Sequence, residues 1–383
     1  MNPEIIYNVQ AGPIWDWKVA MDLYLGGAGV GALLFSILID EFFHGKYRRI
    51  CLTASWLSPV LVGVGLAMIM MKMGRPFSAY HTYLNVNLTS PLWWGGIFQP
   101  ILVAGSLIYA WLWWRPEQRV NQRRLLGRIL VPLTLIVGAY HGLLLAVLGS
   151  HPLWNTGPTV IAAMLAFATS GTAIVMLVHF ARMKFAGRLA DEEHVAKFLD
   201  DLKVVRNALG ALIVIQIGVL FLWWLSLYTG SLHDQLALKA ANESHGSMFW
   251  GLGIGIGLVI PVAMGLYSMW LGESTHRRTQ IRIITITSAL IVIGAFFFRL
   301  ALVLGGQTPV PVQLRNPFQR DSHQRRGEMV EPRTQRPHTG MGGRAHRHPR
   351  RTNPPGRHRV RHRRTARHQL VVTWCLYAST RRV

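Results

Sequence analysis

Cysteine and charged residues are both scarce in this chain. Only 15% of its 383 residues are charged, and its two cysteines, Cys51 and Cys375, lie far apart in the sequence. Neither has a second cysteine two or three positions away, which excludes a disulfide framework and a cysteine-based zinc or iron–sulfur site formed by this chain alone. We therefore expect no metal site in this chain, and any metal-centred redox chemistry has to come from a partner.

Acidic residues are scarcer still, because 17 Asp and Glu stand against 40 Lys and Arg. The excess of positive charge is concentrated in residues 314–383, which contain 18 Arg, no Lys and three acidic residues. A segment of Arg, His, Pro and Gly has almost nothing to bury in a core. Residues 313–383 are therefore predicted to form a tail of different character from the rest of the chain.

Long apolar runs dominate the first part of the chain. Each is near the roughly 20 residues that span a hydrocarbon core as a helix, and none shows the ten-residue alternation of a membrane barrel. They predict an all-α integral membrane protein with eight transmembrane helices, since hydrocarbon offers no partner for free backbone groups. The runs cover about residues 19–39, 54–71, 92–112, 128–148, 157–179, 205–229, 247–270 and 281–303.

The connectors between these runs alternate in charge. Those after the first, third, fifth and seventh runs hold 17 Lys and Arg, whereas the opposite side of the predicted membrane domain holds four. Positively charged loops resist translocation, so the basic connectors are predicted to be cytoplasmic. Both ends of the membrane domain, including the N-terminal segment 1–18, are then expected outside.

The basic tail conflicts with this topology, because after eight helices it would emerge on the outer face. Three interpretations stay open: an extension that binds anionic lipid or nucleic acid, a disordered passenger, or a stretch read in a shifted frame from GC-rich coding sequence. Nucleic acid is not an expected partner, because the charge comes without a folded platform or interleaved aromatic residues. We expect the tail to be disordered or frame-shifted.

Ionisable side chains at membrane depth are costly and often mark a functional site. The predicted topology brings Asp22, Lys72, Tyr140 and His141 to one level of the outer leaflet, and places Arg299 in the last run. A contact between Asp22 and Lys72 would reduce the burial cost of both and would be purely structural. The alternative is a polar pocket that hydrogen-bonds a quinone carbonyl and moves its protons.

Two other cofactor sites are disfavoured. The glycine pattern from Gly26 to Gly31 lies inside an apolar run, not between a strand and a helix as dinucleotide binding requires; Gly27 and Gly31 instead predict close approach of a neighbouring helix. A b-type haem needs histidines on facing helices, and no second intramembrane histidine matches the depth of His141. We expect no haem.

Several motifs in order along residues 14–310 resemble one family, the membrane subunit of polysulphide reductase and its relatives, the NrfD-like quinone-interacting proteins. Each motif is weak alone, but the ordered set on eight helices is fairly specific. The motifs are Trp15-Asp16-Trp17 followed by Ala20–Gly27, Gly74-Arg75-Pro76, Thr89–Gly95, Gly138–Leu144, Pro152–Asn155, and Arg299 with Gly305-Gly306-Gln307.

The resemblance implies a multi-pass subunit of a prokaryotic cytoplasmic (inner) membrane, with its helices in two four-helix bundles. The first bundle, residues 19–148, would hold the quinone site, and residues 149–312 would form the second. Such a subunit has no haem or iron–sulfur cluster of its own. It would exchange electrons between membrane quinone and an outer four-cluster ferredoxin-like iron–sulfur subunit. The quinone, menaquinone or ubiquinone, would be an exchangeable substrate. The iron–sulfur subunit would in turn serve a molybdopterin enzyme or a related catalytic subunit.

The resemblance also names site residues. Tyr140 matches the family's tyrosine in the fourth transmembrane helix and is the leading candidate to hydrogen-bond a quinone carbonyl, with Lys72, Arg75 and Trp17 as further quinone-binding candidates. Lys72 stands near where the family often has an acidic residue, and His141 stands where relatives commonly have Thr.

Proton transfer could therefore be rearranged. Asp22 and His141 are the candidates for it. Asp22, or Asp16 at the membrane interface, could replace the missing carboxylate, and His141 offers a group that titrates near neutral pH. Two other functions stay open from the sequence: a secondary transporter, although the two halves show no convincing repeat, and a purely structural membrane anchor.

Overall fold

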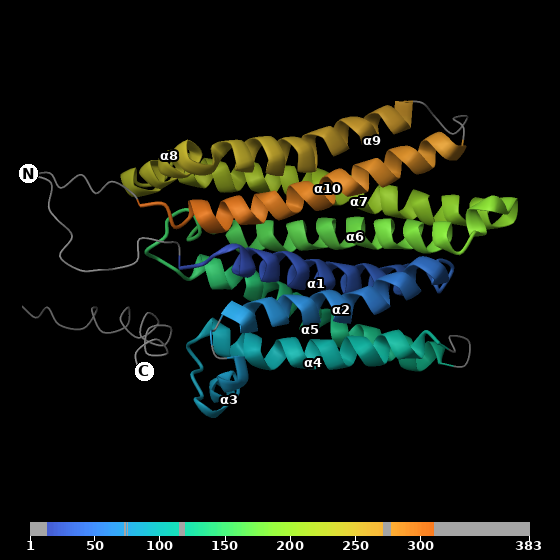
Figure 1. Ribbon diagram of the computed structural model, residues 1–383, viewed down its shortest axis with the longest axis horizontal. Coiled ribbons are helices and arrows are strands. Elements are labelled where there is room, and N and C mark those ends of the chain that lie inside the picture. Colours follow the sequence, from blue (N-terminus) through green and yellow to red (C-terminus); the bar gives the residue numbers. More distant parts are fainter. Residues whose placement is uncertain (1–13, 73, 75, 115–118, 271–276, 310–383) are drawn as a thin grey trace, which may run out of the picture. The chain divides into compact units, whose positions relative to one another are not determined.

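The computed structural model describes residues 14–72, 74, 76–114, 119–270 and 277–309, and within them the chain is helical with no strand (Figure 1). The predicted tail, residues 313–383, lies outside the described residues, as do residues 1–13 of the N-terminal segment. The helices are α1 (Trp17–Phe43), α2 (Arg48–Lys72), α3 (His81–Leu84), α4 (Pro91–Leu112), α5 (Val120–Ala146), α6 (Thr159–Phe185), α7 (Glu192–Tyr228), α8 (Leu232–Gly246), α9 (Ile260–Trp270) and α10 (Arg277–Gly305), with short 3-10 turns at Pro76–Ser78 and Arg188–Ala190.

Eight helices in this part of the chain are long and apolar enough to cross a membrane, which confirms the predicted fold class. Two of them extend well beyond their apolar runs. α7 begins at Glu192, where the Asp191 side chain accepts a hydrogen bond from the backbone of Glu193. Polar first turns such as these carry no hydropathy signal, so only the helix cap marks where α7 starts.

The seventh span is also longer than its apolar run. It begins with the polar helix α8 behind a capping box formed by Ser231 and Asp234. It continues through a π-helical segment, Ser247–Val259, into α9, and the whole span covers Leu232–Ser268.

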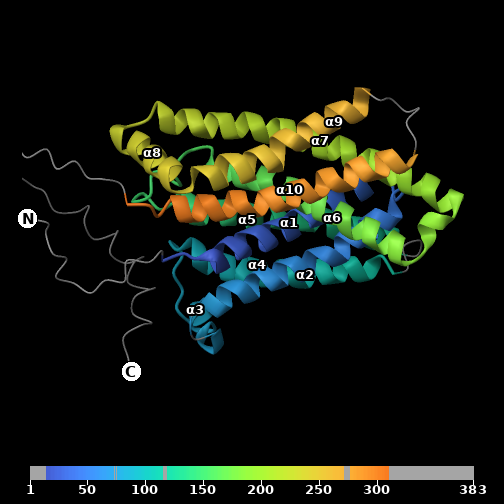
Figure 2. The same cartoon turned by 45° about the horizontal axis from the view of Figure 1, so that its top comes forward.

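Helix α1 lies at the centre of the molecule. Of its most apolar 18-residue window, 83% is buried, whereas the other spans bury 28–56% of theirs. It packs against α2, α5, α6 and α10, so it joins the first four spans to the last four (Figure 2). The predicted boundary between two bundles at residues 148 and 149 stays a prediction, because α1 and α5 both pack closely on α6.

Glycines allow the closest of these helix contacts. A Cβ at Gly31 would lie 2.1 Å from the backbone oxygen of Phe167, and one at Gly27 would overlap the Phe167 ring. In the same way, a Cβ at Gly294 of α10 would lie 2.2 Å from the Cα of Gly257 in the π-helical segment. The close approach predicted for Gly27 and Gly31 is therefore confirmed, with α6 as the neighbour.

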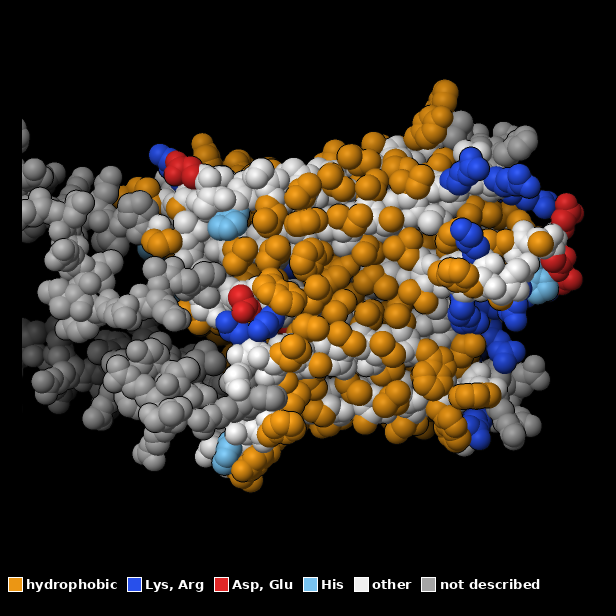
Figure 3. Space-filling model, viewed as in Figure 1, with side chains coloured by type: hydrophobic (Ala, Val, Ile, Leu, Met, Phe, Trp, Pro, Cys, Tyr) orange, Lys and Arg blue, Asp and Glu red, His pale blue; other side chains and the backbone are white. Residues whose placement is uncertain are grey.

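The charged side chains gather at the two ends of the helices, and a hydrophobic belt covers the middle (Figure 3). Lys and Arg are concentrated at the end where α1 runs into α2 and α6 runs toward α7, which we call the basic end. The first turn of α1, the last turn of α2 and the first turn of α4 lie at the other end, which we call the opposite end. The charge asymmetry predicted from the connectors is thus present in three dimensions.

Two buried polar contacts join helices in the basic half of the bundle. Arg123 donates to both oxygens of Asp40, at 2.7 and 2.8 Å, and its guanidinium lies over the Trp113 ring. The His179 Nε2 and an Asp201 carboxylate oxygen are 3.1 Å apart, and both side chains are buried. These contacts connect α1 to α5 and α6 to α7, and each supplies a partner for a buried polar group.

Candidate functional site

Asp22 is a buried carboxylate in the half of α1 nearer the opposite end. Its residue is 4% exposed, and its Oδ1 has no hydrogen-bond partner among the described residues. The carboxylate packs against α2, because a Cβ at Gly65 would lie 3.1 Å from Oδ1. Burying an unpaired acidic group inside a membrane span costs free energy. Its position is therefore more readily explained by a function than by packing.

His141 is held by a hydrogen bond at each ring nitrogen and has no exposed surface. Its Nδ1 lies 2.7 Å from the Val137 backbone oxygen, and its Nε2 lies 3.0 Å from the side-chain nitrogen of Gln99. A carbonyl oxygen only accepts, so Nδ1 carries the proton; an amide nitrogen only donates, so Nε2 carries none. The two contacts fit a neutral imidazole that is protonated at Nδ1.

Gly26 separates Asp22 from His141. A Cβ at this glycine would lie 3.1 Å from His141 Nε2 and 3.6 Å from Asp22 Oδ1. The two polar atoms therefore lie on either side of the Gly26 backbone, and a side chain at this position would crowd His141. The absence of a side chain at Gly26 lets the carboxylate and the imidazole come near each other.

Tyr140 precedes His141 on α5 and is 7% exposed. Its ring fills the place of a side chain at Gly95 of α4, where a Cβ would lie 1.9 Å from the ring carbon that bears the hydroxyl. The Tyr140 and His141 rings meet edge to face at 5.2 Å, and Asp22 lies beside the same glycine, Gly26, as His141. The structure therefore brings Asp22, Tyr140 and His141 together.

Gln99 completes this group, and the sequence analysis did not single it out. It is 4% exposed and comes from the middle of α4, where its amide is the donor to His141. A polar side chain inside an apolar run was the available signal. We call Asp22, Gln99, Tyr140 and His141 the polar cluster.

Lys72 does not pair with Asp22. Its Nζ lies 3.1 Å from Oδ2 of Asp16, at the opposite end of the molecule, and both side chains are about one-third exposed. Asp16 precedes the first turn of α1 as its N-cap, so its side chain points outward beside the end of α2. The structural interpretation that paired Lys72 with Asp22 is wrong, because Asp22 lies farther inside the helix bundle.

The electrostatics of Asp16 favour its charged form. Burial acts to raise the pKa of Asp16, but the hydrogen bond from Lys72, the Lys18 backbone N–H and the nearby positive charges outweigh it and hold the pKa below its usual value. At neutral pH this end of the molecule therefore carries an intact ion pair.

The two other sequence candidates lie apart from the polar cluster or outside the described residues. Trp17 occupies the first turn of α1 with half of its surface exposed, beside the Asp16–Lys72 pair. Arg75 is not among the described residues. The structure thus leaves both as predictions.

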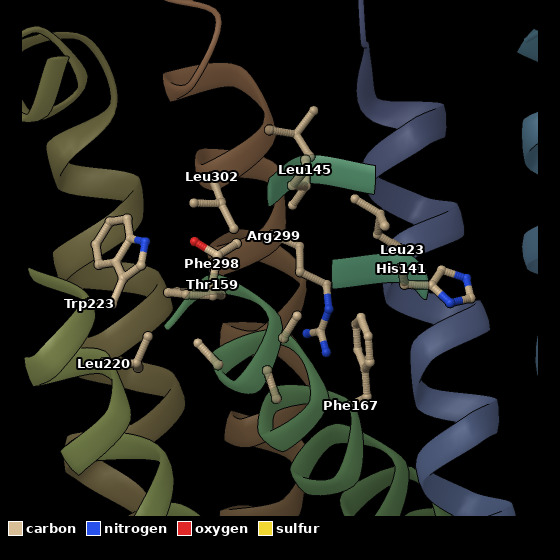
Figure 4. A pocket seen from close by; sticks show the side chains of 14 residues that line it. Leu23, His141, Leu145, Thr159, Phe167, Leu220, Trp223, Phe298, Arg299 and Leu302 are labelled. Atoms are coloured by element: carbon tan, nitrogen blue, oxygen red, sulfur yellow. The ribbon is translucent and has the colours of Figure 1, made fainter. Parts of the chain in front are cut away.

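A cavity of about 30 Å³ borders the polar cluster on the side of the last four spans. It is lined by His141 and Arg299 together with apolar side chains such as Phe167 and Phe298 (Figure 4). Phe167 lies between the Arg299 guanidinium and the His141 ring, at 5.1 and 5.7 Å from them. The cavity does not lie between Asp22 and Tyr140, so a ring that reaches the Asp22 carboxylate has to displace packed side chains.

Arg299 is buried without a described carboxylate partner. Its guanidinium donates to the Ala295 backbone oxygen and to the Ser170 hydroxyl, and faces the rings of Tyr24 and Phe167. Backbone and hydroxyl acceptors with aromatic faces replace a counter-ion here. The side chain therefore ties α10 to α6 and α1 next to the polar cluster.

With this geometry established, comparison with known proteins identifies the family. The family model described as polysulphide reductase, NrfD, matches residues 7–311. The chain belongs to the NrfD polysulphide reductase family. The match ends where the composition changes, so the basic tail falls outside the family's region.

Relatives in the NrfD family align along most of their own length. The chain is 24% identical to the protein NrfD homolog of Haemophilus influenzae and 22% identical to protein NrfD of Escherichia coli, each over 78% of this chain and at least 95% of the relative. It is 25% identical to one chain of the polysulfide reductase of Wolinella succinogenes, over 77% of this chain and 95% of that protein. Family membership and eight spanning helices together identify a multi-pass membrane protein.

Proposed function

We propose that this protein is the quinone-interacting membrane subunit of a respiratory oxidoreductase complex. In this role it passes electrons between membrane quinone or quinol and an extracytoplasmic iron–sulfur subunit. Membership of the NrfD polysulphide reductase family carries the proposal, because one aligned relative is by name a chain of polysulfide reductase. The complex's substrate chemistry then belongs to a separate catalytic subunit, consistent with the scarcity of cysteine in this chain.

The polar cluster supports a quinone site in the first four spans. A quinone headgroup needs hydrogen-bond donors for its carbonyl oxygens and a path for two protons. Tyr140 offers a hydroxyl, and Asp22 and His141 offer groups that exchange protons beside Gly26. All three lie in the half of the bundle nearer the opposite end, where the described connectors carry few basic residues.

In the proposed reaction, the partner subunit handles the electrons and residues of this chain handle the protons. Reduction of quinone to quinol takes up two electrons and two protons, and quinol oxidation releases them. The iron–sulfur partner exchanges the electrons, since this chain has no cysteine set to hold a cluster. Tyr140 orients the carbonyl oxygen, while Asp22 and His141 deliver or remove protons at the oxygens.

This proposal also sets the orientation of the chain. The basic end faces the cytoplasm of a prokaryotic cell, and the N-terminal end of α1 faces outward with the Asp16–Lys72 pair. The iron–sulfur subunit then docks on the outward-facing connectors, and the molybdopterin or related subunit binds that partner.

Replacing Tyr140 by Phe tests the quinone site. We expect turnover with quinone or quinol in the assembled complex to fall at least about tenfold, because Phe cannot donate the hydrogen bond that orients the carbonyl oxygen. Assembly with the partner subunits, followed by co-purification, should stay intact. Tyr109→Phe is the matched control, because Tyr109 is also a buried tyrosine but lies near the basic end of α4. Wild-type quinone turnover in Tyr140→Phe would refute this site.

A further inference from the structure

We infer that Gln99 is a positioning residue that fixes which nitrogen of His141 exchanges protons. Its amide reverses when the imidazole is protonated. The role of this pair in quinone chemistry rests on the proposed function, but the pairing itself depends only on the contacts between α4 and α5.

The backbone determines one half of this arrangement. His141 Nδ1 donates to the Val137 oxygen one turn earlier on the same helix, at 2.7 Å. That oxygen cannot donate in return, so Nδ1 keeps its proton whether the ring is neutral or charged. Only Nε2 is left to gain or lose a proton.

Gln99 determines the other half. In the neutral state its side-chain nitrogen donates to Nε2 at 3.0 Å. Once Nε2 is protonated, two donors would face each other at this distance in a buried place where water cannot separate them. Rotation of the amide by a half turn brings its oxygen to Nε2 and restores the hydrogen bond. Glutamine can serve both states because it carries a donor and an acceptor on one carbon.

The charged and titratable groups around His141 do not replace Gln99. Asp22 of α1 lies on the other side of Gly26, Tyr140 precedes His141 on α5, and Arg299 of α10 lies behind Phe167 of α6. None of these three side chains forms a hydrogen bond to the His141 ring. Gln99 is the only described side chain that does so.

For quinone chemistry, this arrangement means that one nitrogen of His141 exchanges the proton in both directions of the reaction. Nε2 lies beside Gly26 of α1, as Asp22 Oδ1 does. In quinol oxidation a proton passes from a quinol hydroxyl to Nε2, and in quinone reduction it returns from Nε2 to the quinone oxygen. The same nitrogen is used in both directions because Val137 occupies the other one.

Solid-state nitrogen NMR tests the pairing without any quinone. The full chain, with ¹⁵N-labelled histidine, is placed in liposomes at pH 7, and the His141 signals are those missing in His141→Gln. We expect one protonated and one unprotonated ring nitrogen in the wild type. Gln99→Glu, which offers only acceptors, should produce a ring protonated at both nitrogens. Gln99→Met should shift the Nε2 signal to that of a nitrogen without a hydrogen bond.

The matched control is Gln216→Met. Gln216 is also a buried glutamine, but its oxygen accepts from Thr169 on α6, away from His141. The control should leave the His141 signals unchanged. Wild-type His141 signals in both Gln99 variants, or a wild-type ring protonated only at Nε2, would overturn the inference.

Turnover of the assembled complex separates this inference from the proposed function. Gln99→Glu should lower quinol oxidation at least about tenfold, because the proton-accepting nitrogen is already occupied. Altered NMR signals with unchanged quinone turnover would support the pairing and refute the role of His141 in quinone chemistry. Unaltered NMR signals with reduced turnover in Tyr140→Phe would refute the pairing and leave the quinone site in place.

Discussion

At the scale of single residues, two buried carboxylates of α1 differ in whether they have a partner. Asp40 is 2% exposed and receives two hydrogen bonds from Arg123, whereas Asp22 is 4% exposed and has an oxygen without a partner among the described residues. A paired buried charge stabilises the fold only while both members are present. An unpaired buried acidic group instead costs free energy.

Neutral amides at these two positions should therefore affect stability differently. Asp40→Asn leaves the buried Arg123 without its carboxylate, and we expect it to cost about 3 kcal/mol of unfolding free energy. Asp22→Asn removes no ion pair and should leave stability unchanged or slightly increased. Thermal unfolding in detergent micelles measures both. Equal destabilisation by the two variants would contradict the assignment of Asp22 to function.

The Asp16–Lys72 pair gives a pH-dependent contribution of known sign. Because the folded-state pKa of Asp16 is lowered, the pair stabilises the fold fully above the ordinary carboxyl value and loses that contribution as pH falls through the lowered value. With side chains about one-third exposed, we expect Asp16→Asn to cost about 0.5 kcal/mol at pH 7 and less below about pH 4. Unfolding midpoints of both proteins across this pH range provide the measurement. A cost that grew on acidification would contradict the pairing.

At the scale of helices, the contact between α1 and α6 depends on the absence of side chains. Lipid is as apolar as a leucine side chain, so helices in a membrane associate through close packing and not through hydrophobic burial. Gly27 and Gly31 on α1 and Gly171 on α6 bring the two backbones together. This contact holds α1 beside α5 and so positions Asp22 against His141.

Leucine at Gly31 should force α1 and α6 apart. The Phe167 backbone cannot give way as a flexible side chain can, so we expect a loss of folded protein and of the polar cluster's geometry. Gly63→Leu on α2 is the matched control, because a Cβ there has no neighbour within 4 Å. The yield of monodisperse protein on size exclusion compares them. Equal yields would show that the α1–α6 contact tolerates widening.

At the scale of the whole molecule, the distribution of basic residues predicts its orientation in the membrane. The exposed Lys and Arg at the basic end include Lys46, Arg188 and Arg277, which come from three different connectors. Moving such residues across a membrane is unfavourable, and their positions agree in three dimensions. In the proposed orientation the polar cluster lies in the outward half of the bilayer.

Thiol labelling in intact cells tests this orientation. A cysteine at Ser78, between α2 and α4, should react with a membrane-impermeant maleimide, and a cysteine at Lys46 should react only after the cells are opened. Cys51 does not interfere because it is buried, and Cys375 is replaced by serine in both variants. The reverse labelling pattern would place the quinone site in the inner half of the membrane.

The sequence alone determined the number and position of the spanning helices. A run of apolar residues long enough to cross hydrocarbon can satisfy its backbone only as a helix, so length and composition suffice. The same logic predicted the charge asymmetry and the close contact at Gly27 and Gly31. It also singled out Asp22, Tyr140 and His141, because polar groups inside apolar runs are conspicuous.

Only the tertiary structure decided which of these groups meet. The partner of Lys72 is Asp16 and not Asp22, and the partner of His141 is Gln99, a residue 42 positions away. Contacts of side chains between helices depend on the rotation and depth of each helix, which hydropathy does not encode because lipid-facing and buried positions are equally apolar. Packing at glycine contacts sets the rotation and the depth of each helix, and therefore the geometry of the polar cluster.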